Sequence, residues 1–410
     1  MVRRPRLLRR FVAIVRADPS GVGAGFVALL LSSGGDLVAG LTLGAITHTL
    51  ETLPGLLVLV PAAIGMRGNI FGGLGSRFST AIHTGTFRVS RRLDTLVGQN
   101  VAASLALSLS ISLVLAVLAK AVSVGFGVAN SISIVDFVVI SVVGGILSSV
   151  VVLLVVVVVT ATSVRFDLDL DNVNTPIVTA AGDMVTLPGL FLATYLVGIT
   201  GFTPAVAVLC AIAGVVALVM SWRAGLPIMR RIVRESVPVL VLAGSVDVIA
   251  GITIQKRIDS FLVFPALLVL VPPFLEDSGS LGAILSARIA SKLHLGTLGE
   301  GRGPWRAATD DVLLIYLYAV PVFVFLGLSF VIVAHVVQLH SPGAARMLGV
   351  SLLAGFVATT ASVVVGFYSA VATYRLGLDP DNHGVPLVTS SLDLLGALSL
   401  ILAIVILGLT

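Results

Sequence analysis

The sequence predicts an all-α polytopic membrane protein with about 11 transmembrane helices, arranged as two parallel five-helix repeats joined by one linker helix. First, 57% of the 410 residues are hydrophobic, and the mean hydropathy is +1.12. Second, only 11% of the residues are charged, whereas soluble domains are about 25% charged. Third, the second half of the chain repeats the apolar pattern and several motifs of the first half.

The elements are predicted from the apolar runs, because a helix needs roughly 20 residues to cross a bilayer. Residues 1–22 form a basic cytoplasmic N-terminal segment, and residues 23–200 form the first repeat. Residues 201–235 form the linker transmembrane helix and a cytoplasmic loop, and residues 236–410 form the second repeat. The predicted spans are 23–50, 53–82, 96–124, 132–163, 174–199, 203–221, 236–255, 260–291, 308–334, 346–374 and 385–409.

Two pairs of segments define the internal repeat. Residues 56–86 align without a gap with residues 267–297, and twelve of the thirty-one positions are identical. Residues 171–183 (DNVNTPIVTAAGD) return as residues 381–393 (DNHGVPLVTSSLD), with six of thirteen positions identical. We therefore expect both repeats to build one shared site.

The relative orientation of the repeats depends on the span at 203–221, which has no counterpart in the second half. Five helices per repeat is an odd number, so directly joined repeats would be antiparallel. The extra span carries the chain back across the bilayer, which makes the repeats parallel around a pseudo-twofold axis along the membrane normal. The two repeats then form a pseudo-dimer, so a monomer can be functional.

The charge distribution predicts the topology. The net charge is +5, but the basic residues gather in short loops between apolar spans, where they orient the protein rather than bind nucleic acid. The excess of arginine in alternate loops places the N-terminus in the cytoplasm and the C-terminus outside. We expect an integral protein of the plasma membrane. The single cysteine, Cys210, rules out an intrachain disulfide and a cysteine-based metal cluster.

A polar stripe recurs on the last span of each repeat. On a helix the spacing places Asn172, Thr179 and Asp183 on one face, and the second repeat has the same arrangement at Asn382, Thr389 and Asp393. A carboxylate inside the bilayer is costly, roughly 2.5–3.5 kcal/mol on insertion scales. Carboxylate, hydroxyl and amide oxygens are ligands for Mg²⁺, Ca²⁺ or Mn²⁺. The alternative is that each aspartate only hydrogen-bonds a neighbouring helix.

A second symmetric pair, Asp36 and Asp247, lies inside the first span of each repeat and has either a pathway role or a structural one. The second span of each repeat contains proline and glycine, which predicts a broken helix with free carbonyl groups. Further candidate ligands on these spans are Asn69, Glu276 and Asp277. Arg67 either pairs with one of these two acids as a charge-pair gate or extends to a membrane interface.

These segments resemble a known family. VPAAIGMRGNIFGGLGSRFSTAIHTG and DNVNTPIVTAAGDMVTL, with ASKLH and DNHGVPLVTSSLD in the second half, are similar to the membrane signatures of eukaryotic solute-carrier magnesium transporters related to bacterial MgtE. The resemblance implies a divalent-cation channel or transporter, chiefly for Mg²⁺, with a pore between two five-helix units and the pore aspartate at Asp183 and Asp393. Because about twenty residues precede the first span, we expect none of the family's soluble sensor modules.

The sequence therefore predicts transport of a partly hydrated divalent cation, with Mg²⁺ as the transported ion and no cofactor or catalytic residue. Its partners are divalent cations and the lipid bilayer. A first alternative is a Na⁺- or H⁺-coupled cation exchanger that uses Asp36 and Asp247. A second is an intramembrane aspartyl enzyme, which the symmetric duplication of a whole stripe disfavours. A structural scaffold would need no matched buried acids.

Overall fold

The computed structural model describes residues 19–88, 92–166, 170–296, 308–378 and 383–409, together with residues 10, 11, 13, 15, 16 and 305. Within these ranges the fold is helical and contains no strand. The helices of the first part of the chain are α2 (Pro19–Ala45), α3 (Thr47–Thr52), α4 (Leu56–His83), α5 (Leu96–Gly125), α6 (Ile134–Phe166), α7 (Leu170–Thr194) and α8 (Phe202–Arg223). Those of the second part are α9 (Pro227–Gln255), α10 (Ile258–Val263), α11 (Ala266–His294), α13 (Thr309–Val336), α14 (Ala344–Leu376) and α15 (Val385–Ile406).

Eleven of these helices are long and apolar enough to cross a membrane, which confirms the predicted fold class. The predicted first span ran to residue 50, but α2 ends at Ala45 and the polar segment Thr47–Thr52 forms the separate helix α3. Gly55, at a φ of 96°, then turns the chain into α4. The second half makes the same turn through α10.

The second helix of each half is continuous, so the expected break with free carbonyl groups is wrong. Pro61 lies in the second turn of α4, and Pro272 and Pro273 lie in the second and third turns of α11. Each proline removes one backbone hydrogen-bond donor, yet both helices continue through their prolines. Surrounding helices bury both elements: 72% of the most apolar stretch of α4 and 78% of that of α11 lie inside the molecule.

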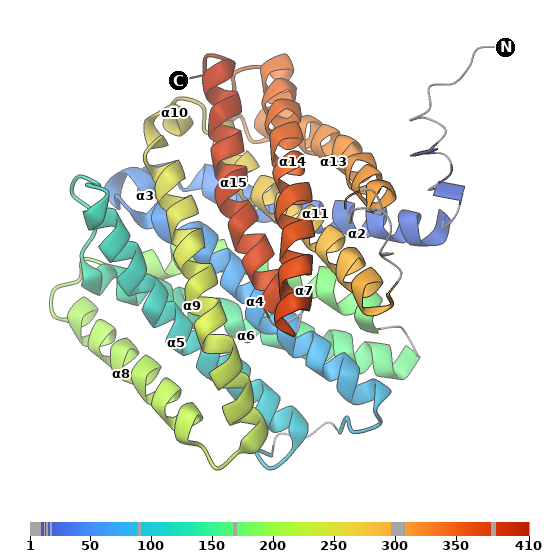
Figure 1. The fold of residues 1–410 in the computed structure, drawn as a ribbon. Helices are drawn as coiled ribbons and strands as arrows, with labels where there is room; N and C mark the ends of the chain where they lie inside the picture. The colour runs from blue at the N-terminus through green and yellow to red at the C-terminus, as the bar shows by residue number, and fades with distance from the viewer. Residues whose placement is uncertain are drawn as a thin grey trace.

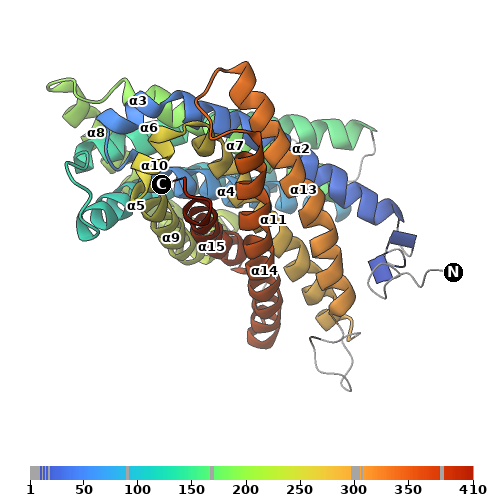
Figure 2. The ribbon, with the colours of Figure 1, turned by 90° about the horizontal axis from the view of Figure 1, so that it is seen from above.

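Corresponding helices of the two halves run in the same direction. Figure 1 shows α4 and α11 both running from upper left to lower right. The two short connecting helices, α3 and α10, lie at the same end of the molecule as the C-terminus. This arrangement agrees with two parallel repeats. Helix α8, which has no counterpart, lies at the periphery in both views (Figures 1 and 2).

The halves interlock through their first two membrane helices: α4 packs against α9, and α11 packs against α2. Two glycines allow the closest approach. A Cβ atom on Gly40 would lie 2.1 Å from the carbonyl oxygen of Val269, and one on Gly251 would lie 2.3 Å from that of Val58. These contacts are symmetry mates, because 211 positions separate both the glycines and the valines. The pseudo-twofold relation therefore extends to individual backbone contacts.

Candidate cation site

Six acids inside membrane helices form one electrostatic cluster where the halves meet. Five helices contribute one or two each: α2, α7, α9, α11 and α15 supply, in order, Asp36, Asp183, Asp247, the neighbours Glu276 and Asp277, and Asp393. The five aspartates are buried, at 8% exposure or less, and Glu276 is half-buried. Glu276 interacts electrostatically with each of the five aspartates. The cluster joins both halves of the chain.

The first-half pair consists of Asp36 on α2 and Asp183 on α7, whose side chains are in direct contact. Small residues bring the two helices together, since a Cβ atom on Gly35 would lie 2.9 Å from the Cβ of Ala180. Neither oxygen of Asp36, nor Oδ2 of Asp183, accepts a hydrogen bond from any described residue. Two touching carboxylates without a donor need a proton or a cation between them.

The second-half pair consists of Asp247 on α9 and Asp393 on α15. Ser390, one helical turn before Asp393, lies beside Asp247. Gly65 of α4 faces this pair: a Cβ atom there would lie 3.3 Å from Oδ2 of Asp247 and 3.6 Å from Oδ2 of Asp393. The pair therefore occupies space that a side chain at position 65 would need.

The two pairs also interact with each other, because Asp183 and Asp393 belong to the same electrostatic cluster. We expected Asp183 and Asp393 to face each other across the pseudo-twofold axis. Each also interacts with the aspartate on the first membrane helix of its own half, and the facing arrangement across the axis stays a prediction. The second symmetric pair, Asp36 and Asp247, thus belongs to the same site as the first.

Asp277 is held by a hydroxyl group. The Oγ of Ser33 on α2 donates to the Asp277 carboxylate, at 2.8 Å from Oδ1 and 2.9 Å from Oδ2. In the other half the equivalent positions are Gly244 and Met66, where a Cβ atom on Gly244 would lie 3.8 Å from the Met66 Sδ. The α2–α11 contact is therefore hydrogen-bonded and the α9–α4 contact is apolar.

Arg67 does not pair with Glu276 or Asp277, so the charge-pair gate is wrong, and it does not extend to an interface either. It is fully buried, and it donates from Nε to Ser148 Oγ at 3.2 Å and from Nη2 to Ser112 Oγ at 2.9 Å. Gly145 makes room for the guanidinium, because a Cβ atom there would lie 2.3 Å from Nη2. Arg67 lies two residues from Gly65, on another side of α4 from the acids.

The hydroxyl and amide candidates lie along α4, α7, α11 and α15. A Cβ atom on Gly68 would lie 3.5 Å from Thr179 Cγ2, and one on Gly279 would lie 3.5 Å from Thr389 Cβ, so the threonines occupy matching places. Thr389 donates its hydroxyl group to the backbone of its own helix. The amide Nδ2 of Asn69 is buried and has no hydrogen-bond partner in the described structure. The side chain of Asn172 and the whole of Asn382 lie outside the described residues.

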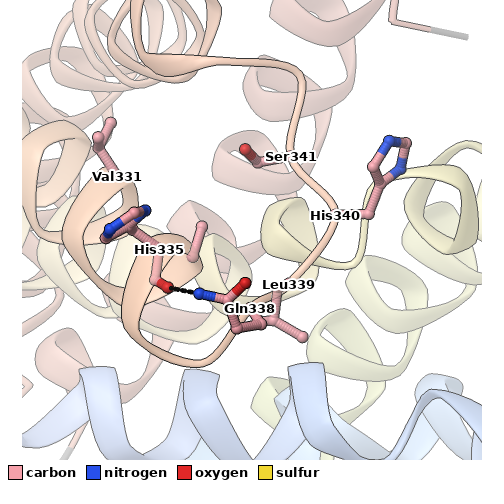
Figure 3. Close-up of a pocket in the computed structure, with 7 residues that line it drawn as sticks. Val331, His335, Gln338, Leu339, His340 and Ser341 are labelled. Atoms are coloured by element: carbon pink, nitrogen blue, oxygen red, sulfur yellow. Dashed lines mark hydrogen bonds between the residues drawn. The ribbon is translucent and has the colours of Figure 1, made fainter.

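Among the described residues, no group of three histidine, cysteine, aspartate or glutamate side chains converges as a metal site. A pocket of about 510 Å³ lies elsewhere, between α13 and α14, and its lining includes His335, Gln338 and His340 (Figure 3). The side chain of His340 contacts the Val263 carbonyl oxygen at 2.8 Å and stacks on Phe264. This pocket contains none of the six acids of the cluster.

Comparisons with known proteins agree with the repeat. A family model described as MgtE, divalent cation transporter, matches residues 60–193 and 271–403, one segment in each half. Solute carrier family 41 member 3 from Rattus norvegicus is 26% identical over 408 residues, which cover 90% of this chain and 84% of that protein. Solute carrier family 41 member 2 from Homo sapiens is 25% identical over 407 residues, covering 92% of this chain and 69% of the relative. No solved structure is significantly similar to this chain.

Proposed function

Since the chain belongs to the MgtE family of divalent cation transporters, we propose that it carries Mg²⁺ through a pore between its two repeats, with Asp183 and Asp393 as the principal cation-binding residues. The observation that carries this proposal is that each of these aspartates is paired with a buried carboxylate, that of Asp36 or Asp247, whose two oxygens accept no hydrogen bond from the described residues. Asp36 contacts Asp183 in one half, and Asp247 contacts Asp393 in the other.

The alternative of purely structural aspartates predicts hydrogen-bonded carboxylates, as found at Asp277. Asp36 and Asp247 instead have both oxygens buried without a donor among the described residues. Uncompensated carboxylates in a low-dielectric interior are strongly unfavourable. A site that repeatedly binds and releases a cation explains why the chain keeps two such pairs.

The ligand chemistry favours Mg²⁺. The site offers oxygen atoms from carboxylates, with the hydroxyl groups of Thr179 and Thr389 further along the same helices. Mg²⁺ dehydrates reluctantly and is usually held through one or two carboxylates while it keeps several waters. Each aspartate pair can hold the hydration shell of such an ion and balance its charge. The polar stripe residues Asn172 and Asn382 extend this path in the proposal.

The test is cation flux in proteoliposomes that contain a Mg²⁺-sensitive dye. We expect Asp183→Asn and Asp393→Asn each to reduce Mg²⁺ uptake by at least about tenfold, because one carboxylate charge is lost at a buried site. Glu235→Gln is the matched control, since this exposed acid pairs with Arg231 at the surface. Repeating the assay with Mn²⁺, Co²⁺ and Ca²⁺ gives the selectivity. Wild-type flux in the double variant would overturn the proposal.

Cation-coupled exchange is the second candidate, because Asp36 and Asp247 lie in the same cluster as the proposed Mg²⁺ ligands. A coupling Na⁺ or H⁺ would then compete with Mg²⁺ for the same carboxylates. Imposed Na⁺ and pH gradients separate the two cases: an exchanger responds to them, whereas a channel needs only the Mg²⁺ gradient and the voltage. Membership of a transporter family disfavours the intramembrane aspartyl enzyme.

For the whole chain we propose residence in the plasma membrane, with the N-terminus in the cytoplasm and the C-terminus outside. The functional halves in this proposal are residues 23–200 and 236–410, and residues 201–235 join them. Because one chain supplies both carboxylate pairs, a monomer is sufficient for transport.

A further inference from the structure

The two carboxylate pairs have different surroundings because the central helices differ at one position. In the gap-free alignment of the repeats, Gly65 of α4 corresponds to Glu276 of α11. Gly65 faces the second-half pair: a Cβ atom added there would lie 3.3 Å from Oδ2 of Asp247 and 3.6 Å from Oδ2 of Asp393. Position 65 of α4 therefore supplies no ligand to the second-half pair.

The pseudo-twofold relation places Glu276 against the first-half pair in the way that Gly65 lies against the second. The charge interactions agree. Glu276 is the strongest charged neighbour of Asp183, and it also acts on Asp36. Glu276 also acts on Asp393 and Asp247, so its assignment to the first-half pair rests on the symmetric placement opposite Gly65. Ser280, one turn along α11, lies beside the Glu276 carboxylate. A third carboxylate charge thus lies beside the first-half pair, although the three side chains do not converge as one direct coordination site.

Beside the first-half pair, a hydrogen bond also holds α2 and α11 together. Ser33 of α2 hydrogen-bonds Asp277, the residue after Glu276, and this bond ties α11 to the helix that carries Asp36. The equivalent contact in the other half, between Gly244 and Met66, has no hydrogen bond. The bond between Ser33 and Asp277 therefore restrains Glu276 relative to Asp36, and the other pocket has no matching restraint.

A third carboxylate changes the selectivity as well as the strength of binding. The attraction of a pocket for an ion scales with the product of the charges. An added negative charge therefore stabilises a divalent ion about twice as much as a monovalent ion at the same distance. A hydrated ion at the first-half pair, with the charge of Glu276 beside it, is therefore selected for Mg²⁺ over Na⁺ more strongly than a hydrated ion at the second-half pair.

We propose that Glu276 is the specificity-determining residue of the transporter: it makes the first-half pocket the high-affinity divalent site and leaves the second-half pocket as a weaker transit site. This inference rests on the proposed function. It assigns unequal roles to Asp183 and Asp393, although the repeat makes them equivalent in sequence. Asp183 belongs to the site that retains the ion, and Asp393 to the site that passes it on.

The test combines binding and flux on the full-length protein. Binding is measured as the rise in melting temperature with added Mg²⁺ in detergent, because an ion that binds only the folded state stabilises it in proportion to its occupancy. Glu276→Gln and Asp183→Asn should each raise the Mg²⁺ concentration needed for stabilisation by at least about tenfold. Asp393→Asn should leave the stabilisation at low Mg²⁺ concentration as in the wild type, weaken only the additional stabilisation at high Mg²⁺ concentration, and lose flux.

Flux in proteoliposomes supplies the selectivity. In Glu276→Gln, the KM for Mg²⁺ should rise by at least about tenfold, and excess Na⁺ should inhibit Mg²⁺ uptake more than in the wild type. Glu276→Asp, which keeps the charge on a shorter side chain, should recover part of the loss. Glu235→Gln should match the wild type in both assays.

The outcomes separate this inference from the proposed function. Equal weakening of Mg²⁺ binding by Asp183→Asn and Asp393→Asn would overturn the unequal roles, as would an unchanged KM and Na⁺ sensitivity in Glu276→Gln. In either case loss of flux in both aspartate variants would leave the transport proposal intact. Wild-type flux in the double variant would instead remove the transport proposal, and this inference with it.

Discussion

At the scale of single residues, the hydrogen-bond partners of an acid separate structural acids from candidate ligands. Asp136, at the start of α6, accepts from the backbone and side chain of Ser133. Asp311 of α13 binds Arg288 and Lys292. Asp36 and Asp247 have no such donors among the described residues. The first group stabilises a helix start or a contact between helices, and the second has carboxylate oxygens left for an ion.

Asp311→Asn should therefore lower stability without changing the Mg²⁺ dependence of transport. Asp311 is 1% exposed, and its loss leaves two cations without their acid. We expect a destabilisation of about 1–3 kcal/mol, below the range for fully buried pairs because both partners are partly exposed. Thermal unfolding in detergent measures it. The neighbouring exposed acid gives the control, Asp310→Asn, and an unchanged melting temperature in Asp311→Asn would contradict the assignment.

Gly145→Ala should displace Arg67. The new Cβ would lie 2.3 Å from the guanidinium Nη2 and 2.5 Å from Ser112 Oγ, so the guanidinium or the Ser112 side chain must shift, which weakens the hydrogen bond between them. Leaving a buried charged donor unsatisfied costs about 1–3 kcal/mol or more. The melting temperature should fall clearly below that of Gly34→Ala, a helical glycine with open space around it. Equal melting temperatures of Gly145→Ala and Gly34→Ala would show that the Arg67 guanidinium can adopt another position without loss of stability.

The cluster could be predicted from sequence only in part, and the reason is geometric. A repeated motif identifies residues that are related by symmetry, so it paired Asp183 with Asp393 and Asp36 with Asp247. It cannot show which residues touch within one half, because contact between α2 and α7 depends on packing at Gly35 and Ala180. The same limit hid the bond between Ser33 and Asp277, which has no counterpart in the repeat.

At the scale of helices, glycine positions decide how closely the halves approach. Gly40 and Gly251 lie against backbone carbonyl oxygens of the opposite half. The long apolar spans and their order were predictable, because each exceeds the length that a bilayer requires. The continuity of α4 and α11 was not, since proline and glycine in a helix can equally mark a break or close packing.

Gly40→Ala and Gly251→Ala should each destabilise the folded protein by similar amounts, because the two contacts are symmetry mates. Backbone atoms cannot move aside as the end of a side chain can. We therefore expect overpacking to lower the free energy of unfolding by about 1–3 kcal/mol. Gly72→Ala, with no atom within 4 Å of the added Cβ, should have little effect. Thermal unfolding distinguishes the three variants, and a stable Gly40→Ala protein would contradict the close packing of α2 on α11.

At the scale of the whole molecule, the topology can be tested with single cysteines. With Cys210→Ala as background, Val337→Cys places a thiol in the exposed segment after α13, and Gly225→Cys places one between α8 and α9. A membrane-impermeant maleimide added to intact cells should label position 337 and not position 225. The reverse pattern would invert the proposed orientation. Labelling at both positions after permeabilisation is the control.

The interlocked packing of α4 with α9 and of α11 with α2 also constrains how the protein is made. When synthesis of the first half ends, the surface of α4 that α9 will cover has no protein partner, and that partner is inserted only after α8. The first half therefore stays in the bilayer without its packing partners α9 and α11 while the ribosome synthesises the rest of the chain. Quality-control factors that survey nascent membrane proteins would therefore encounter helices of the first half whose packing surfaces are still uncovered. The acids would come together only after the last helix, α15, has been inserted.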